Sequence, residues 1–275
     1  MPLSRVIDQP VQHFQGETLT VPASNGTRSA YNVRPGMQEI LIEPVLAMRL
    51  QFVPAIRGLL FFDASRPVGS QWIDLLKSRP DFFDRTVVQQ LRELGAMTSS
   101  DFIYVGVVRP IGGLVFDLTT TFNVVVSTLS AQYSQQNNGG WATLTVASDG
   151  TDSGGATLAQ DGLVTFTLPA AGLWEKKRLR DMVDGAPDTE APLHWIRLAV
   201  SATLSTGILW DNLTPISETA PGTDNVAAAT GGVFLKAVTE YTVDIADDVG
   251  ALETIAVAAG ATTARVSWMQ RLNRQ

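Results

Sequence analysis

The sequence contains no cysteine and only two histidines, His13 and His194. The lack of cysteine excludes disulfide bridges, a thiolate nucleophile and cysteine-ligated zinc or iron–sulfur sites, and it fits assembly in a reducing compartment. Histidine is the usual acid–base group at neutral pH, so its scarcity weakens the case for catalysis. Both histidines are interpreted as surface or strand-edge residues.

Basic residues are outnumbered, since 20 Lys and Arg stand against 27 Asp and Glu and give a net charge of −7. A surface of this sign repels phosphates, so neither nucleic acid nor an anionic membrane is expected as a partner. No apolar run approaches the roughly 20 residues of a membrane span, and the first residues lack the apolar core of a signal peptide. The sequence therefore predicts a soluble chain.

Motifs for catalysis and cofactors are also missing. Neither G-x-x-x-x-G-K-[ST] nor G-x-G-x-x-G occurs, and no G-x-S-x-G accompanies the histidines. Asp152-Ser153-Gly154 matches one half of an aspartic protease site, but a second copy is absent, so SDGTDSGG is interpreted as a turn. Asp149 and Asp152 stay open as weak calcium ligands, and an unidentified carboxylate pair for glycoside hydrolysis stays open too. We expect no catalytic, cofactor or metal site, and hence no enzyme.

Two charged clusters have simpler interpretations. The basic residues 176–180 are flanked by Glu175, Asp181 and Asp184, which cancel most of their field, so a solvated loop is favoured over a phosphate site. The acidic cluster Asp244, Asp247, Asp248 and Glu253 is interpreted as a solvated connection between strands.

Short apolar stretches rich in Val, Ile, Leu, Phe and Thr alternate with clusters of Gly, Asn, Asp, Ser and Pro. This pattern is typical of an all-β protein, here an antiparallel, jelly-roll-like β-sandwich with additional N- and C-terminal strands and at most one or two short helices. Strands are expected over residues 18–22, 38–43, 50–53, 58–63, 101–108, 113–118, 123–132, 141–148, 163–168, 195–202, 234–246 and 252–269. A short helix is expected between Ser78 and Gly95, with a strand over 86–91 as the alternative.

The stretch SAQYSQQNNGGWATLTV, residues 130–146, predicts a hairpin. Asn137 to Gly140 supply residues that tolerate the positive φ of a tight turn, so the flanking strands should pair antiparallel. Leu129, Ala131 and Tyr133 would then share one face. No charged residue occurs between Leu118 and Ser148, which favours a sandwich interior, with a surface covered by another subunit as the alternative.

Composition suggests a division of the chain. We expect an N-terminal arm over 1–35, an N-terminal β region over 36–98, a β-sandwich over 99–213, a linker over 214–232 and C-terminal strands over 233–275 that pack with the N-terminal region. The Pro, Gly, Ala and Thr content of 214–232 is typical of a linker.

Aromatic residues are the best candidates for a binding surface, because rigid amphipathic rings stack on sugars and anchor protein interfaces. Trp174 lies in a polar loop and is the favoured interface residue. Tyr133 and Trp141, on either side of the hairpin turn, are further interface candidates, although a place in or beside the core is the simpler interpretation for both.

The series DFIYVGVVRPIGGLVFDL, LSAQYSQQNNGGWATLTVASDGT, DGLVTFTLPAAGLW and HWIRLAVSATLS spans about 105 residues. It resembles a β-sandwich module of tailed-bacteriophage structural proteins. This chain departs from the module at Ser134, where a Trp usually follows Tyr, and at His194, where Tyr usually precedes Trp.

The resemblance implies a virion component that decorates or cements the capsid, or belongs to the tail or baseplate. Its partners would be further copies of itself, a trimer by analogy with particle symmetry, and other virion proteins such as the major capsid protein or tail proteins. Assembly in the bacterial cytoplasm would agree with the missing cysteine. The alternative function is a carbohydrate-binding sandwich at the tail, and a glycan-degrading enzyme is the weakest of the three.

Overall fold

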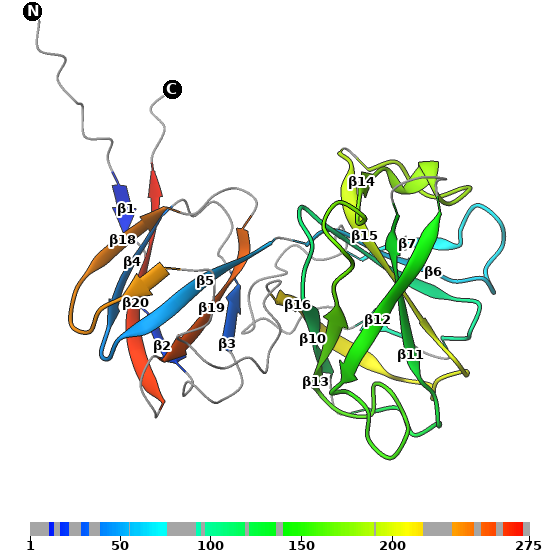
Figure 1. The fold of residues 1–275 in the computed structure, drawn as a ribbon. Coiled ribbons are helices and arrows are strands. Elements are labelled where there is room, and N and C mark those ends of the chain that lie inside the picture. Colours follow the sequence, from blue (N-terminus) through cyan, green and yellow to red (C-terminus); the bar gives the residue numbers. More distant parts are fainter. Residues whose placement is uncertain are drawn as a thin grey trace, which may run out of the picture. The chain divides into compact units, whose positions relative to one another are not determined.

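A computed structural model describes residues 11–13, 17–21, 29–32, 39–54, 56–75, 92–94, 97–118, 121–135, 140–189, 191–216, 233–244, 249–256 and 261–271. The chain divides into two compact units, residues 1–52 with 222–275 and residues 53–221. Both consist of antiparallel strands (Figure 1). Within the described ranges one 3₁₀ turn, Leu179–Asp181, is the sole helical element. The predicted all-β class is confirmed. No described helix has the length and hydropathy needed to cross a membrane.

The first unit contains two sheets. Strand β20 pairs with β1 and β2 along one edge and with β4 along the other, and β18 extends this sheet beyond β4. The second sheet has the order β17-β5-β19-β3. The strands are β1 (Val11–His13), β2 (Glu17–Val21), β3 (Ser29–Asn32), β4 (Glu39–Pro44), β5 (Met48–Pro54), β17 (Val233–Leu235), β18 (Tyr241–Asp244), β19 (Val249–Ala256) and β20 (Thr262–Arg271).

Alternation explains which side chains of this unit are buried. Ile40 and Ile42 of β4 and Ala264 and Val266 of β20 lie on the buried face, two residues apart in each strand, as the period of a strand requires. Strands from the two ends of the sequence therefore share one core.

The second unit is one curled sheet with the order β7-β6-β9-β15-β11-β12-β13-β10-β16-β8, with β14 paired to β15. Its strands are β6 (Ile56–Phe62), β7 (Trp72–Asp74), β8 (Arg92–Glu93), β9 (Phe102–Val107), β10 (Gly113–Leu118), β11 (Leu129–Ser134), β12 (Trp141–Asp149), β13 (Gly162–Thr167), β14 (Lys176–Lys177), β15 (Leu193–Val200) and β16 (Leu209–Ile216).

Strand β12 joins the two halves of this sheet. It pairs with β11 through its first residues and with β13 through its last, and its register shifts between Val146 and Ser148. A bulge of this kind bends a strand and increases its twist. The two halves consequently enclose one core, to which Val105 and Ile196 contribute from one half and Phe116 and Val164 from the other.

Several boundaries differ from the sequence-based division. The region expected over 36–98 is split, because β6 pairs with β9 and thereby joins the second unit from Val53 onward. The expected arm 1–35 contains β1, β2 and β3, which are paired strands. Residues 214–216 belong to β16 rather than to a linker. The remaining linker, 217–232, and the expected helix up to residue 91 lie outside the described residues.

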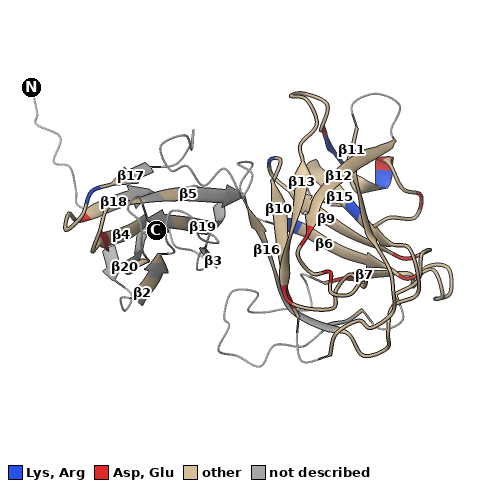
Figure 2. Cartoon of the chain, turned by 60° about the horizontal axis from the view of Figure 1, so that its bottom comes forward, with Lys and Arg blue, Asp and Glu red and all other residues tan. Residues whose placement is uncertain are grey.

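The hairpin prediction is confirmed where the structure describes it. Strands β11 and β12 pair antiparallel from Ser134 opposite Trp141, and Leu129, Ala131 and Tyr133 share the buried face. Turn residues 136–139 lie outside the described residues. Figure 2 shows no Lys, Arg, Asp or Glu along β11, as the uncharged segment requires.

Candidate functional site

Trp174 is not the exposed loop residue that the sequence predicts. It is buried, with 5% of its surface accessible, and its ring lies 5.9 Å from that of Tyr133 and 6.1 Å from that of His194. The reason is a backbone bridge between Trp174 and Gln135, which draws the loop onto the end of β11. The expectation of an exposed aromatic anchor at Trp174 is therefore wrong.

The other two interface candidates lie on opposite faces of the sheet. Tyr133 is buried in the main core beside Trp174. Trp141 is half-buried on the outer face, where its ring lies 5.7 Å from that of Tyr104. The structure thus brings Tyr133 and Trp174 together and separates both from Trp141.

Trp141 belongs to a group of rings on the outer face of the half-sheet β7-β6-β9-β15-β11-β12. Ring centroids are 5.0 Å apart for Phe62 and Trp72, 5.2 Å for Trp72 and Tyr104, and 6.1 Å for Phe102 and Tyr104. We call Phe62, Trp72, Phe102, Tyr104 and Trp141 the aromatic face. All except Tyr104 are partly exposed.

Most of this face is missing from the sequence-based predictions, although the sequence carries a signal for it. Phe102 and Tyr104 stand two residues apart in β9, as do Trp195 and Arg197 in β15. Alternate residues of a strand point to one side, so each pair lies on the outer face. Cross-strand register then aligns Phe62 with Phe102 and Tyr104 with Arg197.

Arg197 brings a positive charge among these rings. Its guanidinium carbon lies 4.7 Å from the ring centre of Phe102 and 4.8 Å from that of Trp141. Its Nε donates to Oε1 of Gln132 at 2.8 Å, and Nη2 donates to the same oxygen. Cation–π contacts and an amide oxygen thus hold the guanidinium in one place.

Burial raises the pKa of Tyr104, and the charge and hydrogen bond of Arg197 partly oppose that rise. Within the part of the chain that the structure describes, Arg197 forms no ion pair with a carboxylate. Exposed hydroxyls of Ser130 and Thr143 lie on neighbouring strands of the same face. The face therefore combines apolar rings, a fixed cation and neutral hydrogen-bonding groups.

Trp195 closes one end of the face. Its indole Nε1 donates to the backbone oxygen of Lys177 at 2.9 Å, and the residue is fully buried. Leu179, from the 3₁₀ turn, packs in the same cluster and covers this end. Phe62, Trp72, Phe102 and Trp141 pack against the same cluster and are partly exposed.

A cavity of about 580 Å³ lies beside the covered end. Leu60, Leu193, Lys176, Asp74 and Asp188 are among its lining residues. Its volume falls within the range of small-ligand sites. Because its lining carries charges of both signs, it indicates no single ligand class.

Three basic residues near this cavity, Lys177, Arg178 and Arg180, have carboxylate partners, one of which, Asp188, was not foreseen. Arg180 donates to Asp188 at 2.7 Å, and Arg178 lies 3.4 Å from the same carboxylate. Lys177 lies 3.5 Å from Glu175. These groups are partly exposed, so the pairs contribute little to stability.

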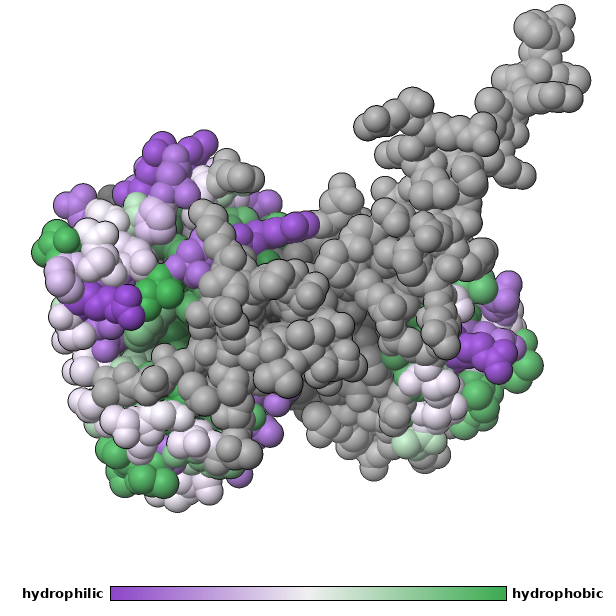
Figure 3. Space-filling model, turned by 180° about the vertical axis from the view of Figure 1, so that it is seen from behind, coloured by the Kyte–Doolittle hydropathy of each residue, from purple (hydrophilic) through white to green (hydrophobic). Residues whose placement is uncertain are grey.

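A second surface feature is the loop of residues 121–128, which we call the valine loop. It was expected to be the first part of a strand, but β11 begins only at Leu129. Val124 is 82% exposed and Val126 72% exposed, with Val125 at 38%. Seen from behind, the described surface of the second unit mixes hydrophobic and hydrophilic residues (Figure 3). The valine loop places three apolar side chains consecutively.

Asn123 holds this loop. It is buried, and its Nδ2 donates to the backbone oxygens of Val125 at 2.8 Å and Thr157 at 2.9 Å. Its Oδ1 accepts from the backbone N of Val125 at 3.0 Å and of Ser205 at 3.1 Å. The loop backbone is further bonded to the turn after β12, where the N of Ser127 donates to the backbone oxygen of Gly155 at 3.0 Å. These bonds pair backbone groups of the loop outside a regular strand.

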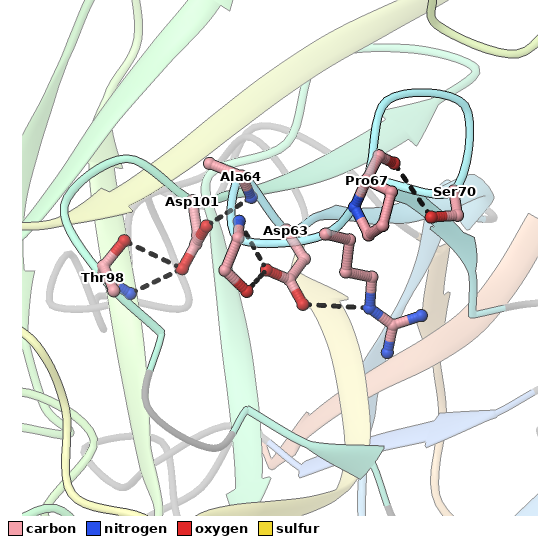
Figure 4. Close-up of polar contacts among 8 residues, drawn as sticks. Asp63, Ala64, Pro67, Ser70, Thr98 and Asp101 are labelled. Carbon is pink, nitrogen blue, oxygen red and sulfur yellow. Dashed lines mark hydrogen bonds and ion pairs between the residues drawn. The ribbon is translucent and has the colours of Figure 1, made fainter.

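The connection between β6 and β7 is ordered by two carboxylates (Figure 4). Asp101 is buried and accepts from the backbone N of Ala64 and of Thr98, both at 2.7 Å. Asp63 accepts from the Ser65 hydroxyl at 2.6 Å and from Arg66 at 3.0 Å. Burial alone would raise the pKa of Asp63, but these hydrogen bonds outweigh it and leave the pKa below its usual value.

Asp149, considered above as a calcium ligand, orders a turn. The Asp149 carboxylate accepts from the hydroxyls of Thr151 and Thr157, both at 2.6 Å, and Gly154 and Gly155 have positive φ, so SDGTDSGG is the predicted turn. Burial, and then the charge of Lys176, lower the pKa of His194 to about 4. Among the described residues, no three His, Asp or Glu side chains gather closely enough to hold a metal ion.

Comparisons with known proteins add little. No protein-family model matches the chain, and no curated protein matches it. Among solved structures, "Structure of infectious bursal disease virus Gx strain" aligns at 9% identity and a TM-score of 0.16, over 96% of this chain and 82% of that chain. A similarity at this level carries no argument about function.

Proposed function

We propose that the chain is a non-enzymatic structural subunit of a tailed-bacteriophage particle, which decorates or cements the capsid through protein–protein contacts. The valine loop is the observation that carries the proposal. Val124 and Val126 are exposed to solvent, because the buried Asn123 fixes the loop backbone through hydrogen bonds. Rigid, exposed apolar groups favour association with a partner, because covering them releases water at little cost in conformational entropy.

The sequence resemblance supplies the context of a phage particle. The motifs that carry it fall on β9, β10, the β11–β12 hairpin, β13 and β15. These strands form most of the second unit, so they offer a scaffold on which loops are presented to neighbours. Partners would be further copies of the chain, a trimer by analogy, together with capsid or tail proteins.

The test is location within the particle. Gold labelling of a tagged chain in purified particles should mark the whole head for a decorating subunit and a single focus for a tail component. Absence of the chain from purified particles would contradict the proposal.

A variant connects the valine loop to assembly. Val124→Ser with Val126→Ser should reduce occupancy on particles about tenfold, a loss of ~1.4 kcal/mol, since it removes apolar contacts from an interface. Val68→Ser is the matched control, because Val68 is also exposed and lies on a different loop of the same unit. An equal loss of occupancy in both variants would contradict a role of the valine loop in assembly.

A second candidate function is carbohydrate binding in host recognition, as a tail or baseplate component. It is favoured by the aromatic face, whose partly exposed rings suit stacking on sugar rings. A glycan array on the purified chain tests it, and loss of binding in Trp141→Ala is the expected result.

A further inference from the structure

The outer face around Arg197 has a charge that the fold does not balance. Its guanidinium contacts the rings of Phe102 and Trp141, the Gln132 amide oxygen and the Tyr104 hydroxyl, all of which are neutral. The described residues provide it with no carboxylate. Asp74 lies in the same cross-strand row through Leu60 and Tyr104, but three strands away, or about 14 Å at the usual strand spacing.

Arginine has five N–H donors, of which two are donated to Gln132 and one to the Tyr104 hydroxyl. Donors therefore remain for a ligand. A guanidinium fixed between two rings loses little conformational entropy when it binds, and its partial burial strengthens a charge-assisted bond.

The surroundings of Arg197 suit a sugar. Phe102 and Trp141 provide apolar ring surface on either side of it. Ser130 and Thr143 provide exposed hydroxyls on β11 and β12. Sugars need this combination, since one side of a pyranose ring is largely apolar and its edge carries hydroxyl groups.

From this arrangement we infer that the face around Arg197 binds an acidic glycan, with the sugar carboxylate on the guanidinium and the sugar ring against Trp141 or Phe102. The inference rests on the second candidate function and names its ligand class. Selectivity for acidic over neutral sugars comes from Arg197, while the aromatic rings contribute to the binding of both kinds of sugar.

The experiment compares matched ligands. Isothermal titration of the full chain with sialyllactose and lactose, and with glucuronic acid and glucose oligomers, measures the contribution of the carboxylate. At least one acidic sugar should bind about tenfold more tightly than its neutral counterpart, and Arg197→Gln should abolish that difference. Raised salt should reduce the difference as well, because the contact is ionic.

Ser130→Glu is a second test that keeps Arg197 in place, for the case that Arg197→Gln misfolds. Ser130 is exposed on β11 and lies diagonally from Arg197, so a carboxylate there would neutralise the guanidinium without entering the core. It should weaken binding of the acidic sugar and leave binding of the neutral sugar unchanged. Thr167→Glu, at another exposed position on β13, should change neither.

The outcomes separate the two ideas. Equal affinity for acidic and neutral sugars would overturn the inference and leave carbohydrate binding in place. Binding of none of these sugars would overturn both. An acid preference that persists in Arg197→Gln would also overturn the inference, because the carboxylate would then bind elsewhere.

Discussion

The indole of Trp195 lies against Gly58, so closely that a Cβ on Gly58 would stand 2.5 Å from the indole Cη2. Gly106 faces the same ring, and its Cβ would stand 2.9 Å from Cη2. Strands β6 and β9 thus have glycines where they face the indole of Trp195 on β15. This fit closes the covered end of the outer face.

Gly106→Ala should lower the free energy of unfolding by about 1–3 kcal/mol, because the new methyl overlaps Trp195 in a packed cluster. Urea unfolding followed by tryptophan fluorescence measures the loss. The double variant with Trp195→Phe should show a smaller added cost, since phenylalanine lacks the atoms that overlap. Additive losses would contradict the proposed contact.

Asp101→Ala should lower the free energy of unfolding by about 2–4 kcal/mol, because it removes a buried carboxylate and leaves the part-buried backbone donors of Ala64 and Thr98 without an acceptor. Asp63→Ala is the control, since its carboxylate bonds the exposed Ser65 and Arg66 and water can replace it. Thermal unfolding of both variants provides the comparison. Similar losses in the two variants would show that the burial of Asp101 does not determine its contribution to stability.

Asn123→Ala should lower stability by about 2–4 kcal/mol and free the valine loop, because hydrogen bonds to several backbone groups are lost at once. Limited proteolysis should then cut within residues 121–128. Val124→Ser is the control from the same loop, because its side chain is exposed and its replacement should leave the loop resistant. Resistance of Asn123→Ala would contradict the role of Asn123.

Trp174→Ala should reduce stability by about 3–5 kcal/mol, because it removes a buried ring that contacts Tyr133. Chemical unfolding measures this loss directly. An unchanged stability together with lost binding to a partner would instead restore the interface role that the sequence suggested.

His194 should make stability depend on pH. Its folded pKa of about 4 lies below its ordinary value of 6.5, so between these two pH values His194 is protonated in the unfolded chain and neutral in the folded chain. The free energy of unfolding should therefore fall as the pH drops from about 6.5 toward about 4. His194→Gln should remove this part of the decline while His13 remains in both proteins. Parallel pH profiles would contradict the assignment.

The sequence by itself determined the fold class, the hairpin pairing and the SDGTDSGG turn. These depend on local properties: alternation of side chains along a strand, the φ preferences of Gly and Asn, and short-range bonds of Asp to its own backbone. Leu129, Ala131 and Tyr133 are buried on one face of β11, as the same alternation predicts.

Tertiary structure alone decided where the exposed and charged groups lie. Val124 to Val126 have the β propensity of a strand, yet Asn123 bonds them into a loop through Thr157 and Ser205, which are distant in sequence. Trp174 is buried because its backbone meets Gln135, and Arg197 meets Trp141 only because β11 lies between their strands. Such pairings depend on strand order, which local sequence patterns do not specify.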